Sequence, residues 1–162
     1  MKPFLAPLAL GVVIGMSALQ IPALVASEKS AAEALLLEVP SPLGFEETLT
    51  RLEANAKGEG WKVPGKWKIN FQKNLKHVTG IDIGPNQVIS MCEPKAAADM
   101  LQVDEYKKLA ALMPCSIAVY EKSDGKTYVS MMNMDMMAAT YGGKVAEWVD
   151  ALRPQMEAML KL

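Results

Sequence analysis

CSIAVYEKSDGKTYVSM, the stretch at residues 115–131, consists of two alternating segments on either side of a tight turn. In the first segment, Ile117 and Val119 alternate with smaller or more polar neighbours, and the alternation resumes after the turn. Asp124-Gly125 is a dipeptide that favours the two-residue turn of a β-hairpin. Alternation with a period of two places apolar side chains on one face of a strand. The stretch therefore predicts a β-hairpin with one buried face.

The segment before the hairpin predicts a strand and then two helical pieces. NQVISMC, at 86–92, has the composition of a buried strand. Pro94 suits the first turn of a helix, where its missing N–H costs nothing. Asp104 is expected to cap a second helical piece at 105–112. Pro114 then ends that piece.

This broken connection places the two cysteines of the chain. Cys92 ends the strand before the connection, and Cys115 begins the strand after it. A single straight helix would carry the chain to the opposite edge of the sheet. Two antiparallel helical pieces, broken near 102–104, return it to the edge that it left. We therefore expect Cys92 and Cys115 to lie close together.

The outer parts of the chain complete the expected element order. LLLEVP, at 35–40, predicts a short strand, and a second strand is expected at 67–71. Apolar residues at helical spacing predict one helix before Gly58 and Gly60, and a last helix after Gly142-Gly143. Their apolar stripes are Phe45, Leu49, Leu52 and Ala56, and Val145, Trp148, Val149, Leu152 and Met156. The order strand, helix, strand, strand, helix, hairpin, helix predicts an α+β domain over 35–162, in which helices pack on one face of a single, mostly antiparallel sheet.

The first 27 residues have the order of a secretory signal peptide. Lys2 is followed by an apolar run, then by Pro22 and small residues up to Ser27. Cleavage near Ser27 would leave a periplasmic or secreted protein with no stable membrane insertion. The alternative is an uncleaved anchor, although the apolar run is barely long enough to span a bilayer.

Composition and motifs exclude several classes of protein. The net charge is −1 and no run of Lys or Arg is present, which argues against nucleic-acid binding. The sequence contains no P-loop, HExxH, GxSxG or CxxC motif and does not indicate an enzyme. A hydrolytic triad would need His77, the single histidine, which lies in a polar stretch expected to be a loop or strand edge. His77 is either a plain exposed histidine or a ligand of a metal or haem.

Three segments together resemble the DUF302 family, a domain of unknown function. SPLGFEETLTRLEANAKGEGWKV, at 41–63, is similar to the family's opening helix and its Gly-Trp-x-Val strand. ISMCEPKAAADML, at 89–101, resembles its strand and proline-led helix, and MPCSIAVYEKSDGKTYVSMMN, at 113–133, its hairpin. The resemblance implies an α+β domain that tends to dimerise, without an established reaction. Cysteines at 92 and 115 resemble a cysteine-bearing subgroup of the family.

Sulfur-containing side chains are the best candidates for a functional site. The chain has 12 methionines, which either fill the core or act as soft ligands. One hypothesis is an exported binding or carrier module for Cu(I), sulfane sulfur or haem. The alternative is a structural or interaction protein with a Cys92–Cys115 disulfide and a homodimer interface; unrelated buried thiols are a further possibility. A third hypothesis is an enzyme with Cys92 or Cys115 as nucleophile, for which the sequence offers only the distant His77 and Lys95 as a base or positive neighbour. The residues proposed for a site are Cys92 and Cys115, with Met91, Met113, Met132, Met134, Met136 and His77 as metal ligands.

Overall fold

The computed structural model describes residues 35–162 and contains one five-stranded sheet. The strand order is β1-β5-β4-β3-β2, and every neighbouring pair is antiparallel. The strands are β1 (Leu36–Pro40), β2 (Lys68–Asn70), β3 (Asn86–Met91), β4 (Cys115–Glu121) and β5 (Thr127–Met132). This architecture confirms the predicted α+β class with a single antiparallel sheet. The predicted leader at 1–27 lies outside the described residues.

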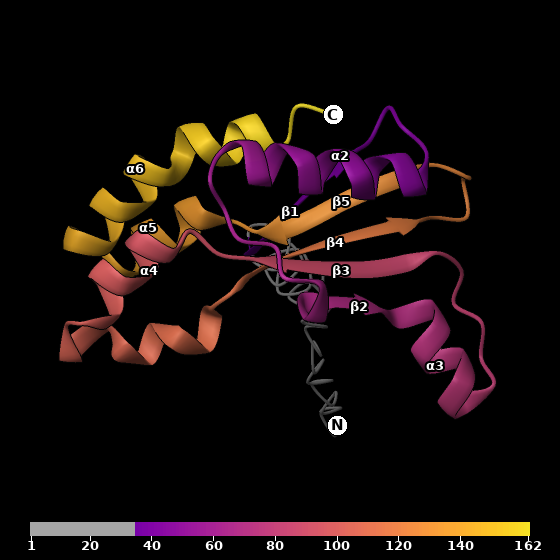
Figure 1. Cartoon of the computed structure of the whole chain (residues 1–162), viewed down its shortest axis with the longest axis horizontal. Coiled ribbons are helices and arrows are strands. Elements are labelled where there is room, and N and C mark those ends of the chain that lie inside the picture. Colours follow the sequence, from indigo (N-terminus) through magenta and orange to yellow (C-terminus); the bar gives the residue numbers. More distant parts are fainter. Residues whose placement is uncertain (1–34) are drawn as a thin grey trace, which may run out of the picture.

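The helices are distributed unevenly around the sheet (Figure 1). Helices α2 and α6 run over one face, α4 and α5 lie together at one end of the molecule, and α3 lies at the other end. The helical elements are α2 (Phe45–Gly58), α3 (Phe71–Thr79), α4 (Pro94–Leu101), α5 (Met134–Tyr141) and α6 (Gly143–Met159), with 3₁₀ segments η1 (Gly65–Trp67) and η2 (Asp104–Leu112).

The β4–β5 hairpin has the predicted alternation. Ile117 and Val119 of β4 are buried, and they pair in register with Met131 and Val129 of β5, which are also buried. Gly125 has φ of 73° in the connecting turn, a conformation that glycine adopts without strain. The hairpin thus presents one apolar face to the helices above it.

The core forms two clusters. In the larger cluster, Leu49, Leu52 and Ala56 of α2 pack against the buried face of β3, β4 and β5. The smaller cluster joins Met100 of α4, Leu109 of η2 and Val145 of α6. Both apolar helix stripes predicted from the sequence therefore contribute to the core, because Val145 and Val149 of α6 are buried as well.

The region between β2 and β3 differs from the prediction. The strand expected at 67–71 covers only Lys68–Asn70, and Phe71 already begins α3. The side chain of Asn70 accepts a hydrogen bond of 2.7 Å from the backbone N–H of Lys73, which caps the helix and stops the strand. The expectation of a loop or strand edge around His77 was therefore wrong, because His77 lies in the last turn of α3.

The connection between β3 and β4 is broken, as predicted, into α4 and η2. The N-cap of η2 differs from the prediction, because Val103 rather than Asp104 occupies this position. The Asp104 carboxylate accepts from Lys107 instead and makes no cap hydrogen bond. The methionine-rich segment after β5 also forms a helix, α5, which begins after Asn133 and had no counterpart in the prediction.

Candidate functional site

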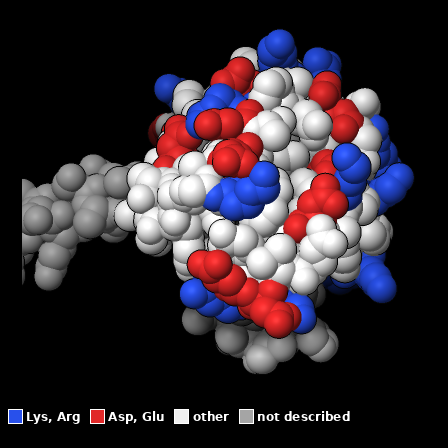
Figure 2. Space-filling model, turned by 90° about the vertical axis from the view of Figure 1, so that its left-hand side faces the viewer, with Lys and Arg blue, Asp and Glu red and all other residues white. Residues whose placement is uncertain are grey.

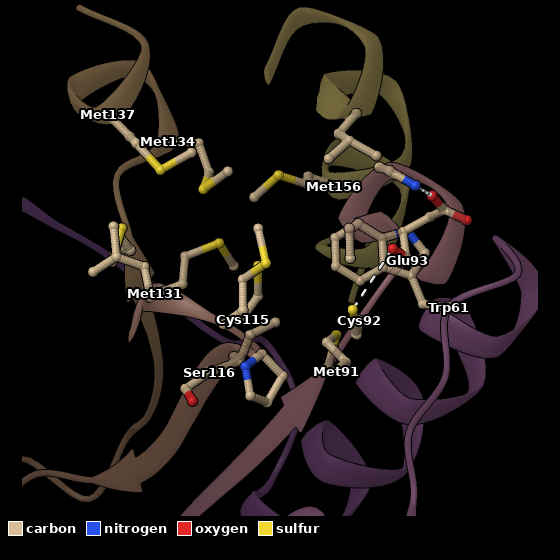
Figure 3. A pocket seen from close by; sticks show the side chains of 18 of the residues that line it. Trp61, Met91, Cys92, Glu93, Cys115, Ser116, Met131, Met134, Met137 and Met156 are labelled. Atoms are coloured by element: carbon tan, nitrogen blue, oxygen red, sulfur yellow. Dashed lines mark hydrogen bonds between the residues drawn. The ribbon is translucent and has the colours of Figure 1, made fainter. Parts of the chain in front are cut away.

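A cavity of about 440 Å³ lies where the two core clusters meet. Its floor is the end of β3 and the beginning of β4, and its walls come from α4, η2, α5 and α6. Figure 3 shows side chains from these elements around the open space. Most of the lining is apolar, and the polar exceptions include Glu93 and Ser116. We call this space the sulfur cavity because of the side chains described next.

The cysteines lie on adjacent strand ends. Cys115 is the register partner of Met91 across the β3–β4 pair. Cys92 follows Met91 and exchanges two backbone hydrogen bonds with Lys62, of 2.8 and 3.1 Å, which hold the chain where β3 ends. Both cysteines line the sulfur cavity, and both are unbridged. The expectation that the broken connection returns Cys115 to the edge of Cys92 therefore agrees with the structure.

The electrostatic surroundings keep both thiols protonated at neutral pH. Burial, and secondarily the neighbouring Cys92, raise the pKa of Cys115 to about 11. Burial also raises the pKa of Cys92, with a smaller effect from the charge of Glu93. The Cys92 Sγ lies 3.6 Å from the backbone oxygen of Glu93, to which it donates. A catalytic thiolate requires the opposite environment, with a base or a positive charge nearby.

Thioethers surround the two thiols. Nine of the ten methionines at positions 35–162 line the sulfur cavity. In Figure 3, the side chains of Met131, Met134 and Met156 point toward one another across the open space. These nine residues are Met91, Met100, Met113, Met131, Met132, Met134, Met137, Met156 and Met159. The cavity is therefore a chamber of soft, polarisable donors from strands, a loop and the three helices α4, α5 and α6.

Two polar contacts fix the side of the cavity nearest Cys92. The indole of Trp61, which is 3 % exposed, donates to the side-chain oxygen of Gln155 on α6 at 2.7 Å. Glu93 is the N-cap of α4, and its carboxylate accepts from the backbone N–H groups of Lys95 and Ala96. Each of these polar side chains has a structural partner, which leaves sulfur as the available ligand atom on this side.

The structure assembles most of the residues proposed from the sequence, although not all of them. Cys92, Cys115 and four of the proposed methionines line the sulfur cavity: Met91, Met113, Met132 and Met134. Met136 lies in a shallower adjoining groove. His77 is exposed on α3, outside the cavity lining. The proposed ligand set lacked Met100, Met156, Met159 and Trp61, because these side chains lie on helix faces or in a loop distant in sequence. It also left out Met131 and Met137, which lie beside proposed ligands at the end of β5 and on α5.

Residues 35–162 contain neither a conventional metal-binding cluster nor a membrane-spanning helix. Within this part of the chain, no group of three or more His, Cys, Asp or Glu side chains could hold a metal ion. A site built on thioethers with two thiols is of a different type. In the same part of the chain, no helix is both long and apolar enough to cross a membrane.

Acidic and basic side chains are mixed on the surface at the end of the molecule that holds the sulfur cavity. In Figure 2, which views the molecule from the end where α4 and α5 lie, acidic and basic side chains alternate among neutral ones. Several are paired with each other: Lys144 with Glu147 at 2.6 Å, and Arg153 with Asp135 at 2.6 Å.

Comparison with known proteins places this chain in a family. The model of the domain of unknown function DUF302 matches residues 37–162. The chain belongs to the DUF302 family. It is similar to the crystal structure of an uncharacterized conserved protein DUF302 from Bacillus stearothermophilus, with a TM-score of 0.66 and 26 % identity over 78 % of this chain and 95 % of that one. No curated protein matches the chain significantly.

Proposed function

We propose that this DUF302 protein is a small exported module that binds a soft ligand in the sulfur cavity, and that the ligand is Cu(I). The observation that carries the proposal is the gathering of both cysteines and nine methionines around one space. Thiolate and thioether sulfur select Cu(I) over hard cations such as Mg²⁺ and Ca²⁺. Cys92 and Cys115 would supply the anionic ligands, and neighbouring methionines would supply neutral ones.

Core filling alone explains this distribution less well. Methionine packs readily into irregular cores, and some of these side chains, such as Met91 and Met159, are almost fully buried. Core filling, however, does not require the methionines to share a cavity with both cysteines. It also does not require that cavity to hold almost every methionine of the described residues. We therefore treat the wall of the cavity as a ligand set.

Two other soft ligands are less favoured by the site. Haem is most often held by histidine, by histidine with methionine, or by a cysteine thiolate; the single histidine of the chain, His77, lies on α3, outside the cavity. A persulfide forms when a thiolate attacks a sulfur donor, and the raised pKa of Cys115 opposes this reaction. A metal ion, in contrast, displaces the thiol protons as it binds.

Anaerobic titration with Cu(I) against a chromophoric chelator tests the proposal. We expect the protein to retain about one Cu(I) per chain, as a single thiol pair allows. Cys92→Ser and Cys115→Ser should each weaken retention by roughly tenfold or more, about 1.4 kcal/mol. Met136→Leu is the matched control, because this methionine lies outside the cavity lining. Failure of the protein to compete for Cu(I), or equal retention by the doubly substituted variant, would overturn the proposal.

The same preparations separate the alternatives. A visible absorption band in the purified protein would indicate haem, and a mass increase of one sulfur atom would indicate a persulfide. Absence of free thiols without reductant would favour the structural protein with a Cys92–Cys115 disulfide. Export itself is tested by intact mass, which should show a mature chain that begins near Ser27, in agreement with the signal-peptide order of the first 27 residues.

A further inference from the structure

A shallow groove of about 190 Å³ adjoins the sulfur cavity beside α5. Leu112, Met132 and Met137 line both the groove and the cavity, so the two spaces meet at these side chains. The other residues that line the groove are Leu35, Asn133, Met136, Thr140 and Tyr141. We call this space the α5 groove. It gives the sulfur cavity a second opening toward the surface.

Three thioethers are the soft donors of the α5 groove. Met132 lies at the end of β5, and Met136 and Met137 lie in α5. All three side chains are half-buried. None of the described residues that line the groove is a cysteine, histidine, aspartate or glutamate. A soft ion in the α5 groove would therefore be held by neutral thioethers rather than by thiolates.

Backbone hydrogen bonds fix the turn that carries these thioethers. The backbone oxygen of Asn133 accepts from the N–H groups of Met136 and Met137, at 3.2 and 3.3 Å. The N–H of Asn133 donates to the backbone oxygen of Leu35 at 2.9 Å, and its side chain caps α5 by accepting from the N–H of Asp135. The first turn of α5 is thus tied to the neighbouring chain before any ligand arrives. Such support is what a binding site requires.

We propose that the α5 groove is a second, weaker Cu(I) site, through which the ion enters and leaves the sulfur cavity. The inference rests on the proposed function, since it describes the route of the ion to the thiols. Cu(I) accepts thioether ligands, and without an anionic ligand it is held less tightly and can move on. Met132 and Met137 belong to both spaces, so they can stay bound to the ion while Met136 is exchanged for a ligand of the cavity.

Further thioethers continue from the α5 groove toward the thiols. In Figure 3, the side chains of Met137, Met134 and Met131 follow one another from α5 toward Cys115. All four residues line the sulfur cavity. The ion can therefore pass from sulfur to sulfur, with one bond made as another breaks. At the floor it displaces the thiol proton of Cys115, which leaves to solvent.

The side of the cavity next to Cys92 is a poorer entrance. Its thioethers, Met91 and Met100, are at most 3 % exposed. The carboxylate of Glu93 is a hard donor and already accepts from two backbone N–H groups of α4. An ion that arrived there would meet a protonated thiol with no accessible thioether ahead of it. Half-buried methionines are found instead beside α5.

Loading rates test the route. The protein, in excess and at several concentrations, is mixed anaerobically with a chromophoric Cu(I) complex in a stopped-flow instrument. Met136→Leu keeps the side-chain volume and removes the sulfur, so we expect loading and release each to slow by roughly tenfold, as the loss of one ligand allows. Both rates fall together because entry and exit use the same groove, and retention at equilibrium depends on their ratio. Ala139→Leu is the matched control and should load at the natural rate, because Ala139 is exposed on α5 and lines neither space.

A second measurement does not depend on the thiols. Cys92→Ser, Cys115→Ser protein with ¹³C-labelled methionine methyl groups is titrated with Ag(I), a soft and redox-stable probe. The methyl signal of Met136 is identified by its loss in Met136→Leu. It should shift on addition of Ag(I), and equally at pH 6 and pH 8, because a thioether has no proton to release.

The outcomes separate this inference from the proposed function. Natural protein that retains Cu(I), but loads no faster than Met136→Leu, would overturn the entry route and leave the proposed function intact. A Met136 signal that does not respond to Ag(I) would overturn the groove as a metal site. A Met136 shift in a protein that does not retain Cu(I) against the chelator would overturn the proposed function and leave the groove as a soft-metal site.

Discussion

Met91 and Cys115 are register partners across β3 and β4, so a thioether and a thiol lie side by side on the core-facing side of the sheet, at the point where both strands reach the sulfur cavity. Cys92, which follows Met91 in the chain, is fixed by its two backbone hydrogen bonds with Lys62. The sulfur atoms of the floor are consequently carried by the most regular part of the fold. A site on paired strands holds its geometry better than one on a loop.

The two thiols should react at very different rates with an alkylating agent. The pKa of Cys115 is raised to about 11, so little thiolate exists at pH 7 and the rate should rise tenfold per pH unit up to that value. Cys92 is less enclosed and should react first. Peptide mass spectrometry after timed iodoacetamide treatment from pH 7 to 10 measures both rates. Equal rates at neutral pH would contradict the burial of Cys115.

Metal binding should release protons. Because both thiols are protonated at pH 7, one bound Cu(I) should displace about two protons, and its apparent affinity should rise with pH. A pH-stat or indicator dye in weak buffer measures this release during anaerobic titration. Either single cysteine-to-serine variant should reduce the release to about one proton. Binding without proton release would show that thioethers alone hold the metal.

Glu93 should affect both helix stability and the neighbouring thiol. Its carboxylate caps α4 and raises the pKa of Cys92 as a minor contribution after burial. Glu93→Gln retains an oxygen acceptor but removes the charge, so Cys92 should alkylate faster with little change in stability. Glu93→Ala should give the same faster alkylation and lose about 1 kcal/mol in urea unfolding. If Glu93→Gln leaves the alkylation rate unchanged, Glu93 does not act on Cys92 through its charge.

Asn55 should hold the end of α6 in place. Its side-chain amide donates to the backbone oxygens of Met159 and Lys161, at 3.1 and 3.0 Å. Asn55→Ala should cost about 1–2 kcal/mol of unfolding free energy and speed hydrogen exchange at residues 156–162. Arg51→Ala, on the same helix, removes only an exposed ion pair of 3.9 Å to Glu47 and should cost less than about 0.5 kcal/mol. Similar losses in the two variants would refute this role of Asn55.

The elements that were predicted correctly are those whose apolar residues recur at strand or helix spacing and pack in the core. The hairpin was predicted from the alternation around Ile117 and Val119, and α2 from the spacing of Leu49, Leu52 and Ala56, because these side chains pack in the core. Helix α3 was missed although Phe71, Leu75 and Val78 have helical spacing, because all its other positions are polar or charged and none of its residues is buried. The cap by Asn70, which ends β2, was the available signal.

The site was predictable only in its strand-borne part. Cys92, Cys115 and Met91 follow from strand ends and a broken connection. The contributions of Met100, Met156 and Met159 depend on how α4 and α6 are placed over the sheet, which no local pattern encodes. Met156 belongs to the apolar stripe predicted for the last helix, and part of that stripe forms a wall of the cavity. The proposal of His77 as a ligand came from residue type alone, which carries no spatial information.

The thioether wall also makes the cavity sensitive to oxidants. Conversion of a methionine to its sulfoxide replaces an apolar group by a strong dipole and needs a specific reductase for reversal. Met91, Met100 and Met159 are each at most 3 % exposed, whereas Met132, Met134 and Met137 are only partly covered. Peroxide should therefore oxidise the methionines near α5 first. The sulfoxides formed there would make that side of the cavity polar and admit water before the buried methionines react. The order in which sulfoxides accumulate would record how deeply an oxidant has entered.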